Sequence, residues 1–172
     1  MNGTRGSDNA QEQALCELVN RYQTELLRMC YLYLRDSALA EDAVQETFLK
    51  AYKALPAFRG ECGQKTWLMR IAMNTCRDMR RSGWFRHIDP SVRPENLPEA
   101  FTPFEPPDES LTLSIMRLPR RCREAVLLHY YQNMSIAETA EALGVSASTV
   151  STQLTRARKK LRAMLEGGRF HG

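Results

Sequence analysis

Hydrophobic residues recur at intervals of three or four along most of the chain, which is the spacing of one face of an α-helix. No segment shows the strict alternation of apolar and polar positions that is typical of a half-buried strand. The spacing predicts helices over residues 11–35, 37–55, 66–81, 111–118 and 119–131, followed by a pair over 135–143 and from about 147 onward. Within the third of these helices, the side expected to be buried carries Trp67, Ile71, Thr75 and Met79. Asp36 and Ser37 are expected to end the first helix and cap the second.

The last two predicted helices have the spacing of a helix-turn-helix. Ser135 and Glu138 form a potential capping box, and Gly144 can adopt the left-handed φ that ends a helix. Ser146 or Ser148 can cap the helix that follows. The apolar positions of the pair are Ile136, Ala140 and Leu143 on the first helix, and Val150, Leu154 and Leu161 on the second. A small residue, a turning glycine and a branched residue at these intervals let two helices cross closely.

The polar side of the last helix suits DNA. Its first turns offer short donors and acceptors for base edges, namely Ser148, Thr149, Ser151, Thr152, Gln153 and Thr155. Its far end offers cations for phosphates, namely Arg156, Arg158, Lys159, Lys160 and Arg162. The alternative is a solvated basic face on a helical hairpin that packs against another protein. The order of polar and then basic residues along one helix favours the DNA reader.

Charge is segregated along the chain although the net charge is only +4. Residues 1–49 carry eight acids and four arginines, whereas 50–86 carry nine bases and two acids. Residues 147–172 carry six bases and one acid. Two separate contacts with a polyanion are the simplest explanation for two basic blocks.

Residues 85–110 read as a linker by composition, since they hold six of the eight prolines and are acidic from His87 onward. A plain tether is one interpretation, and an acidic strip that imitates nucleic acid in a positive channel is the other. The domain organisation that follows is a loose tail over 1–10, a helical domain over 11–84, the linker over 85–110, a helix-turn-helix domain over 111–166 and a tail over 167–172. The predicted fold is therefore all-α, with two small helical domains joined by a proline-rich acidic linker.

The five cysteines form no CxxC pair and indicate reduced thiols in a cytosol. Cys62 lies in a predicted loop and is the one weak candidate for a redox role. No run of about eighteen apolar residues exists, and the polar start does not resemble a signal peptide. We therefore expect a soluble, cytoplasmic protein without membrane insertion.

Three strings of residues carry a resemblance to a known family. AEDAVQETFLKAY at 40–52, FRGECGQKTWLMRIAMNTCRDMRR at 58–81 and LPRRCREAVLLHYYQNMSIAETAEALGVSASTVSTQLTRARKKL at 118–161 stand in that order around the linker. Together they resemble an extracytoplasmic-function (ECF) sigma factor of bacterial RNA polymerase, over about residues 11–165. The resemblance implies a non-catalytic subunit, without metal or cofactor, that binds core polymerase at its clamp and flap, directs it to promoter DNA and melts the −10 region. It also implies an anti-sigma factor as a further partner.

The resemblance assigns roles to matching residues. Docking on the polymerase clamp falls to Asp42, Gln45, Glu46 and Phe48. Contacts with the −10 element and its flipped base fall to Phe58, Arg59, Gly60, Lys65, Thr66, Arg70, Asn74, Arg77, Arg80 and Arg81. Contacts with the −35 element fall to Ser148, Thr149, Ser151, Thr152, Gln153, Thr155, Arg156, Arg158 and Lys159. Trp67 can be read as a stacking aromatic, but its place on the apolar stripe favours a core residue. The chain departs from the family where basic residues often stand, at Ser151 and Gln153, which weakens any assignment of individual base contacts.

Two other functions fit parts of the sequence. Asp42 and Glu46, one helical turn apart, can in principle share a divalent ion as in a nuclease, but no histidine or third carboxylate accompanies them at matching spacing. A solvated helix face is the ordinary reading of such a pair. The second alternative is a helix-turn-helix transcriptional regulator that acts without polymerase.

Overall fold

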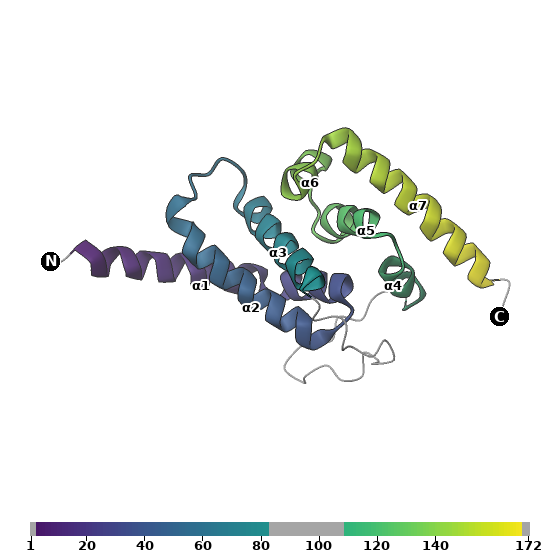
Figure 1. Ribbon diagram of the computed structural model, residues 1–172. Helices are drawn as coiled ribbons and strands as arrows, with labels where there is room; N and C mark the ends of the chain where they lie inside the picture. The colour runs from purple at the N-terminus through teal and green to yellow at the C-terminus, as the bar shows by residue number, and fades with distance from the viewer. Residues whose placement is uncertain (1–2, 83–108, 170–172) are drawn as a thin grey trace.

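The computed structural model describes residues 3–82 and 109–169. Its first half consists of three long helices, which are α1 Gly3–Leu34, α2 Ser37–Ala54 and α3 Gln64–Arg81, with a 3₁₀ turn at Leu55–Ala57. Its second half consists of α4 Glu109–Met116, α5 Arg120–Val126, a π-helical turn at Leu127–Tyr131, α6 Ile136–Leu143 and α7 Ala147–Arg169 (Figure 1). No strand occurs in these two described stretches, and the predicted all-α class with a helix-turn-helix at its end is confirmed.

The helix ends follow from local chemistry. Asp36 accepts a hydrogen bond from the Leu39 amide at 2.8 Å and caps α2. The Ser135–Glu138 capping box closes in both directions, at 3.0 and 2.7 Å. Gly144 ends α6 with φ +68°, the left-handed conformation that glycine adopts without a steric penalty. Of the two serines proposed to cap the last helix, Ser146 is the one whose hydroxyl accepts from the Thr149 amide, at 3.2 Å.

Several boundaries differ from the expected ones. Residues 3–10, expected as a loose tail, continue α1, because extending an existing helix costs much less than nucleating one. Glu109 and Ser110, assigned to the linker, already belong to α4. Gly167 and Gly168, expected to release the tail, lie inside α7, since a glycine costs only about 1 kcal/mol in a helix. Pro119 is the N-cap of α5 instead of its first helical residue. The rest of the predicted linker lies outside the described residues.

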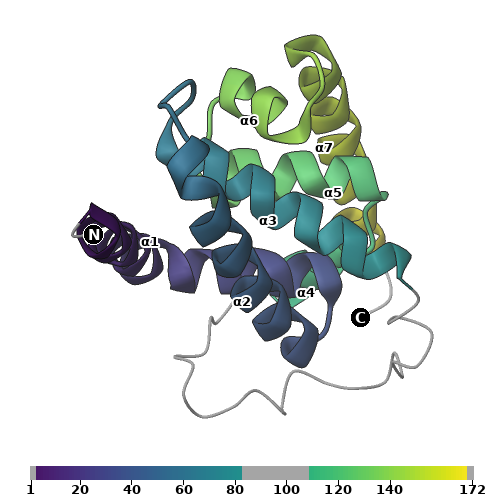
Figure 2. The ribbon, with the colours of Figure 1, turned by 60° about the vertical axis from the view of Figure 1, so that its left-hand side comes forward.

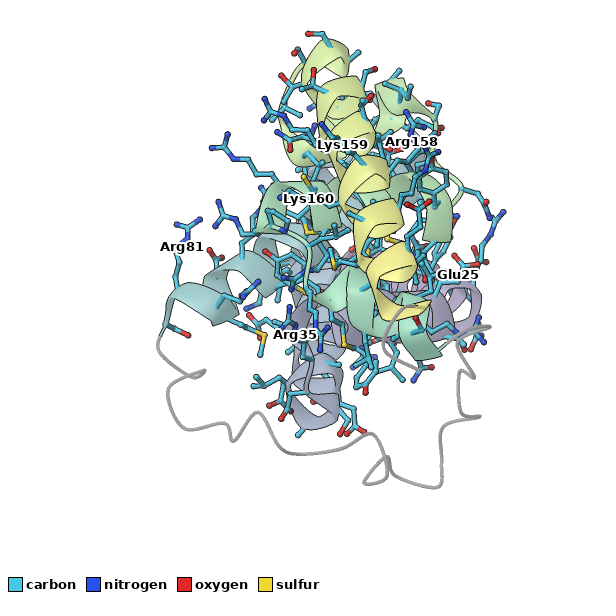
Figure 3. All side chains as sticks on the ribbon, turned by 90° about the vertical axis from the view of Figure 1, so that its right-hand side faces the viewer. Glu25, Arg35, Arg81, Arg158, Lys159 and Lys160 are labelled. Carbon is cyan, nitrogen blue, oxygen red and sulfur yellow. The ribbon has the colours of Figure 1, made fainter. Side chains whose placement is uncertain are left out.

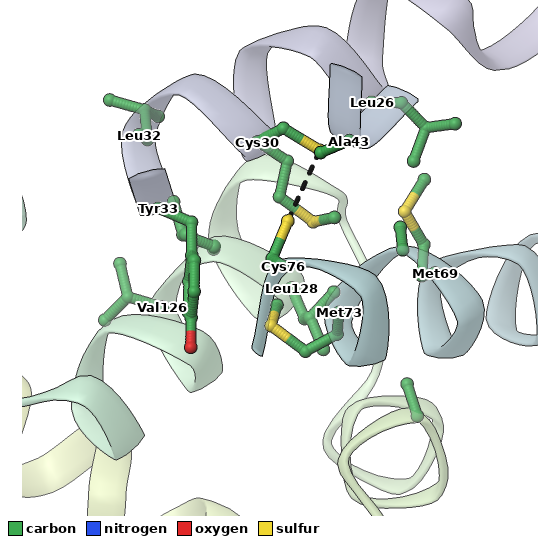
Figure 4. Close-up of a cluster of buried hydrophobic side chains, with 14 of the residues drawn as sticks. Leu26, Cys30, Leu32, Tyr33, Ala43, Met69, Met73, Cys76, Val126 and Leu128 are labelled. Carbon is green, nitrogen blue, oxygen red and sulfur yellow. Dashed lines mark hydrogen bonds between the residues drawn. The ribbon is translucent and has the colours of Figure 1, made fainter. Parts of the chain in front are cut away.

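One hydrophobic cluster runs through both halves of the structure. Leu26 and Leu32 of α1, Met73 of α3, and Val126 and Leu128 of the second half belong to the same cluster (Figure 4). Figure 2 shows α1 and α2 on one side of α3, with α5 and α6 on the other. The two halves are thus packed against each other through α3.

The buried face of α3 is rotated from the predicted one. Its fully buried side chains include Leu68, Met69, Ala72, Met73 and Cys76, together with the expected Thr75. Trp67, Ile71 and Met79 are only partly buried at the edge of the core. On α6 the expected stripe is also shifted, since Ile136 is exposed and Thr139 is buried. Two partners on opposite sides of α3 widen its buried face, which periodicity alone does not predict.

Two thiols meet inside the first half. The Cys76 thiol donates to Cys30 at a sulfur–sulfur distance of 3.6 Å, and both residues are fully buried and unbridged (Figure 4). This hydrogen bond, and then burial, raises the pKa of Cys30. In the described part of the chain, no helix combines the length and apolar character needed to cross a bilayer.

Candidate functional site

The outer face of α2 carries the residues assigned to polymerase docking. Asp42, Gln45 and Glu46 lie on this face, whereas Phe48 is buried apart from an edge. A groove of about 500 Å³ on one side of this face is lined by Asp42, Gln45, Glu46 and residues of α3. A second groove of about 610 Å³, between α1 and α2, is lined by Val44, Gln45 and Phe48 together with side chains of α1. The predicted patch is therefore a ridge between two grooves.

Leu49 is a residue of this ridge that sequence reasoning missed. It lines both grooves, and 56% of it is exposed, which is the largest exposed fraction among the large hydrophobic residues of the described chain. The available signal was an apolar residue four positions after Gln45, on the polar side of α2. Together with Leu15, Val19, Val44 and Phe48, which line the same groove, Leu49 forms a contiguous apolar surface, and such surfaces mark sites that bind other proteins.

The loop before α3 carries the first part of the predicted −10 site. Phe58 stacks on Trp67 with ring centroids 4.7 Å apart, and Trp67, expected as a core residue, is partly buried and packs against the edge of the core. Arg59 and Gly60 are exposed, and Gly60 has φ +75°. Lys65 is half-buried and pairs with Glu25 at 3.5 Å. Thr66 is only 3% exposed, so its side chain is not presented to a ligand.

The four arginines assigned to this site on α3 do not share one environment. Arg81 is exposed, and Arg80 lies over the Tyr33 ring with its guanidinium carbon 5.4 Å from the centroid. Arg70 donates to the backbone carbonyl of Glu141 on α6, at 3.2 Å from Nε. Arg77 is paired with Glu124 of α5, and it also donates to exposed Asn74 at 3.4 Å. Two of the four are therefore in contact with the second half of the chain.

The residues assigned to the −35 element lie on α7, the second helix of the helix-turn-helix. The residues that are exposed among those assigned to the −35 element are Ser148, Ser151, Thr152, Thr155, Arg156, Arg158 and Lys159, whereas Thr149 and Gln153 are half-buried. The Thr152 and Thr155 hydroxyls donate to the carbonyls one turn earlier, at 3.0 and 2.9 Å, which leaves their lone pairs to accept. Arg158 donates to the Tyr130 hydroxyl at 3.0 Å. Figure 3 shows Arg158, Lys159 and Lys160 along α7, with Arg81 at the end of α3.

A buried ionic cluster joins the two halves, and we call its members Tyr33, Arg77, Arg123 and Glu124 the Glu124 cluster. The Glu124 carboxylate, whose side chain is 3% exposed, accepts from Arg77 at both oxygens, at 2.9 and 2.8 Å. The Tyr33 hydroxyl also donates to it, at 3.0 Å. Arg123 donates to the Tyr33 carbonyl at 3.0 Å. A bidentate arginine–carboxylate pair is among the strong hydrogen-bonded contacts of proteins.

The surroundings fix the protonation states in this cluster. Hydrogen bonding to Glu124 raises the pKa of Arg77, so that its guanidinium stays charged. Burial, and then the Glu124 carboxylate, raise the pKa of Tyr33, so that its phenol remains a donor. Burial, and then Arg35 and Arg80, lower the pKa of Arg123 to about 10, which still leaves it charged near neutral pH.

A cleft of about 260 Å³ lies where the two halves meet. Its lining includes Arg77 and Arg81 of α3, Arg120 of α5, and Thr149 and Gln153 of α7. Residues assigned to the −10 element and residues assigned to the −35 element thus line one small space. The two assigned surfaces are neighbours in this structure.

The acidic pair and the loop cysteine were also candidates for chemistry. Within the described residues, no three side chains of His, Cys, Asp or Glu lie close enough together to hold a metal ion, so Asp42 and Glu46 have no further ligand there. Burial raises the pKa of the half-buried Cys62 thiol, which reduces the thiolate that redox chemistry needs.

Comparison with known proteins adds to this geometry. Residues 18–86 match the family model of sigma-70 region 2, and residues 108–161 match that of sigma-70 region 4. The chain is 32% identical over 154 residues to the ECF RNA polymerase sigma factor SigM of Mycobacterium tuberculosis, covering 88% of this chain and 77% of that protein.

Two solved structures have similar folds. One is CnrH in complex with the cytosolic domain of CnrY, with a TM-score of 0.69, 25% identity, and coverage of 95% of this chain and 94% of that chain. The other is the Bartonella quintana sigma factor RpoE in complex with the anti-sigma factor NepR, with a TM-score of 0.68 and coverage of 90% and 96%. At 23% identity the second likeness shows the fold alone.

Proposed function

This chain belongs to the ECF RNA polymerase sigma factors, which direct bacterial RNA polymerase to promoters, and we propose that it divides this task between its two halves. The first half docks on core polymerase and captures the −10 element. The second half holds the −35 element as duplex. The observation that carries this proposal is the acidic and apolar α2 ridge in the first half together with the exposed polar and basic face of α7 in the second.

The ridge supports docking because its chemistry fits a protein surface better than DNA. Asp42 and Glu46 repel phosphates but can pair with cations on a partner, and Leu49, which follows them on α2, offers apolar area beside them. The grooves on both sides can receive side chains of a helical partner. We therefore assign clamp docking to Asp42, Gln45, Glu46 and Leu49, with Phe48 forming the floor of one groove.

The loop before α3 supports capture of an unpaired base. A base that leaves the stack needs an aromatic face or apolar surface to cover it and polar groups to read its edge. The stacked pair of Phe58 and Trp67 supplies aromatic surface, and exposed Arg59 and Asn74 supply polar groups. Because Thr66 is buried, we leave it out of the proposed reading set.

The exposed face of α7 supports duplex reading. Its first turns present hydroxyl groups to base edges, and Arg156, Arg158 and Lys159 follow for phosphates. Ser151 and Gln153 stand where basic residues are common in the family, so fewer arginine side chains are available for bidentate hydrogen bonds with guanine. We therefore expect phosphate contacts to supply most of the affinity.

We further propose that the chain performs no reaction of its own and acts in the cytoplasm, where polymerase and promoters are found. An anti-sigma factor is a fitting partner, because CnrH, which is 25% identical to this chain, forms a complex with the cytosolic domain of another protein, CnrY. Such a protein would inhibit by covering the α2 ridge or the basic surfaces of α3 and α7.

Co-migration with core polymerase on a sizing column tests the proposal. We expect the chain to elute with core and to bind isolated promoter duplex weakly. A regulator that acts without polymerase would elute apart from core and bind its own site tightly, and that result would overturn the proposal.

A further inference from the structure

The cleft of about 260 Å³ where the two halves meet suits a ligand that promoter recognition does not involve. We propose that it binds a small phosphorylated anion, namely a diphosphate group that is either free or part of a nucleotide. Arg81 of α3 and Arg120 and Arg121 of α5 hold the phosphates in this site. The function proposed above gives the two arginines of α5 no role, and this site supplies one.

The first support is the charge of the cleft. Four arginines line it, and Glu124 is the only acid among the described residues of the lining. Arg77 pairs with Glu124 through two hydrogen bonds, at 2.9 and 2.8 Å, so these two charges cancel. The guanidiniums of Arg81, Arg120 and Arg121 are left to balance an anion. A diphosphate group matches them with about three negative charges near neutral pH, since its terminal phosphate carries nearly two.

The second support is that these guanidiniums are available. Arg81 and Arg121 are exposed, and within residues 3–82 and 109–169 neither side chain makes a hydrogen bond or an ion pair. Arg120 is half exposed, and its Nε lies 3.9 Å from Glu124, at the outer limit of an ion pair. A guanidinium presents its N–H donors in a planar fork that matches the oxygens of a phosphate. The three arginines can therefore turn toward an anion without breaking a strong contact.

The third support is the size of the cleft. At about 30 Å³ for each water molecule, its 260 Å³ has room for roughly nine waters. A diphosphate group fits such a space, and a nucleoside attached to it would lie at the mouth. A DNA duplex cannot enter a space of this size. The volume therefore favours a small ligand over a nucleic acid.

The fourth support is the polar wall that α7 contributes. The Cys122 thiol donates to Oε1 of Gln153 at 3.3 Å, so in this amide orientation the Nε2 group of Gln153 remains to donate to an anion. Burial raises the pKa of Cys122, which keeps its thiol protonated as the donor. The Thr149 hydroxyl lines the same wall and can also donate. The cleft thus offers donors from α3, α5 and α7 to a ligand whose oxygens accept.

Isothermal titration calorimetry of the full chain with sodium diphosphate tests the site, at about 150 mM NaCl and without divalent cations. Sulfate at equal ionic strength controls for screening, and ADP, GDP and a short mixed-sequence DNA single strand are titrated as the other sources of phosphate. The variants Arg81→Gln and Arg121→Gln each remove one guanidinium, from α3 and from α5. The matched control is Arg162→Gln, because Arg162 is exposed on α7 roughly 13 Å along the helix from Gln153 and does not line the cleft.

We expect saturable binding of a single diphosphate, with sulfate binding at least about ten-fold more weakly. Arg81→Gln and Arg121→Gln should each lower the diphosphate affinity by about ten-fold or more, because each loses a charge-assisted hydrogen bond. Arg162→Gln should stay within about two-fold of wild type, since a charge beyond the Debye length is screened. Equal affinities for diphosphate and nucleotides would identify the free group as a sufficient ligand, and tighter nucleotide binding would place the nucleoside against the mouth of the cleft. Both outcomes support the site.

The proposal is wrong if diphosphate does not saturate the chain, or if Arg162→Gln weakens binding as much as the cleft variants. A loss confined to one of the two cleft variants would also contradict it, because the site requires arginines from both halves. The same holds if only the DNA strand binds with a dependence on Arg81 and Arg121, since the cleft would then belong to the nucleic-acid surface. None of these measurements involves polymerase or a promoter, so their outcome is separate from a failure of the function proposed above.

Discussion

Leu49 offers the sharpest test of the docking surface. It stands on the α2 ridge between two grooves with 56% of its surface exposed, so its apolar area is available to a partner. The substitution Leu49→Ala removes three carbon groups without opening a cavity in the core. We therefore expect the free energy of unfolding to change by less than about 0.5 kcal/mol.

The expected loss of core affinity follows from that exposure. Three buried carbon groups are worth about 2.4 kcal/mol at about 0.8 kcal/mol each. Because 56% of the residue remains to be buried by a partner, docking should lose about 1.3 kcal/mol, which corresponds to roughly ten-fold in affinity.

The assay is a fluorescence titration of labelled chain with core polymerase lacking its own specificity subunit. Ile136→Ala is the control, because Ile136 is also an exposed aliphatic residue, at 36%, but lies on α6 in the other half. We expect the control to bind like wild type. If Leu49→Ala binds core within two-fold of wild type, or if both variants weaken equally, the α2 ridge is not the docking surface.

Further predictions concern folding, melting and thiols. Gly144→Ala should destabilise the folded chain by about 1 kcal/mol, because alanine resists a φ of +68°. Gly167→Ala, inside α7, should instead stabilise it by about 0.5–1 kcal/mol. Equal shifts of the two variants in thermal melts would contradict this. Asn74→Ala should impair promoter opening, read by permanganate reactivity of unpaired thymines, while core binding survives; equal loss of both would count against a base-reading role. Exposed Cys16 should react with Ellman's reagent first at pH 7.5, and Cys62 more slowly because its raised pKa leaves less thiolate; the reverse order would revive a redox role for Cys62.

The parts of the fold that sequence predicted well are those set by near neighbours. The capping box of Ser135 and Glu138, the αL glycine at position 144 and the Asp36 cap each depend on residues within one helical turn. Their outcome does not depend on what packs against them. The same holds for the exposed polar face of α7, whose placement follows from the buried positions Val150 and Leu154.

The parts that sequence did not predict depend on packing between distant segments. Glu124 looks like an ordinary solvated acid in RRCREAVLL, and only the approach of Tyr33 and Arg77 makes it a buried one. Trp67 packs at the edge of the core as its apolar stripe indicates, but its stacking on Phe58 depends on how the loop before α3 folds back, which periodicity does not predict. Leu49 falls on the polar side of α2 and is exposed. No neighbour among the described residues explains an apolar residue there, and we attribute it to the proposed docking on polymerase.

Promoter selection by this chain is tested most directly by reconstituted transcription on total genomic DNA, with transcript 5′ ends mapped for core polymerase alone and for core plus the chain. We predict a set of new start sites that share two conserved upstream elements near −10 and −35 and that vanish without the chain. Start sites identical with and without the chain would refute a role in promoter selection.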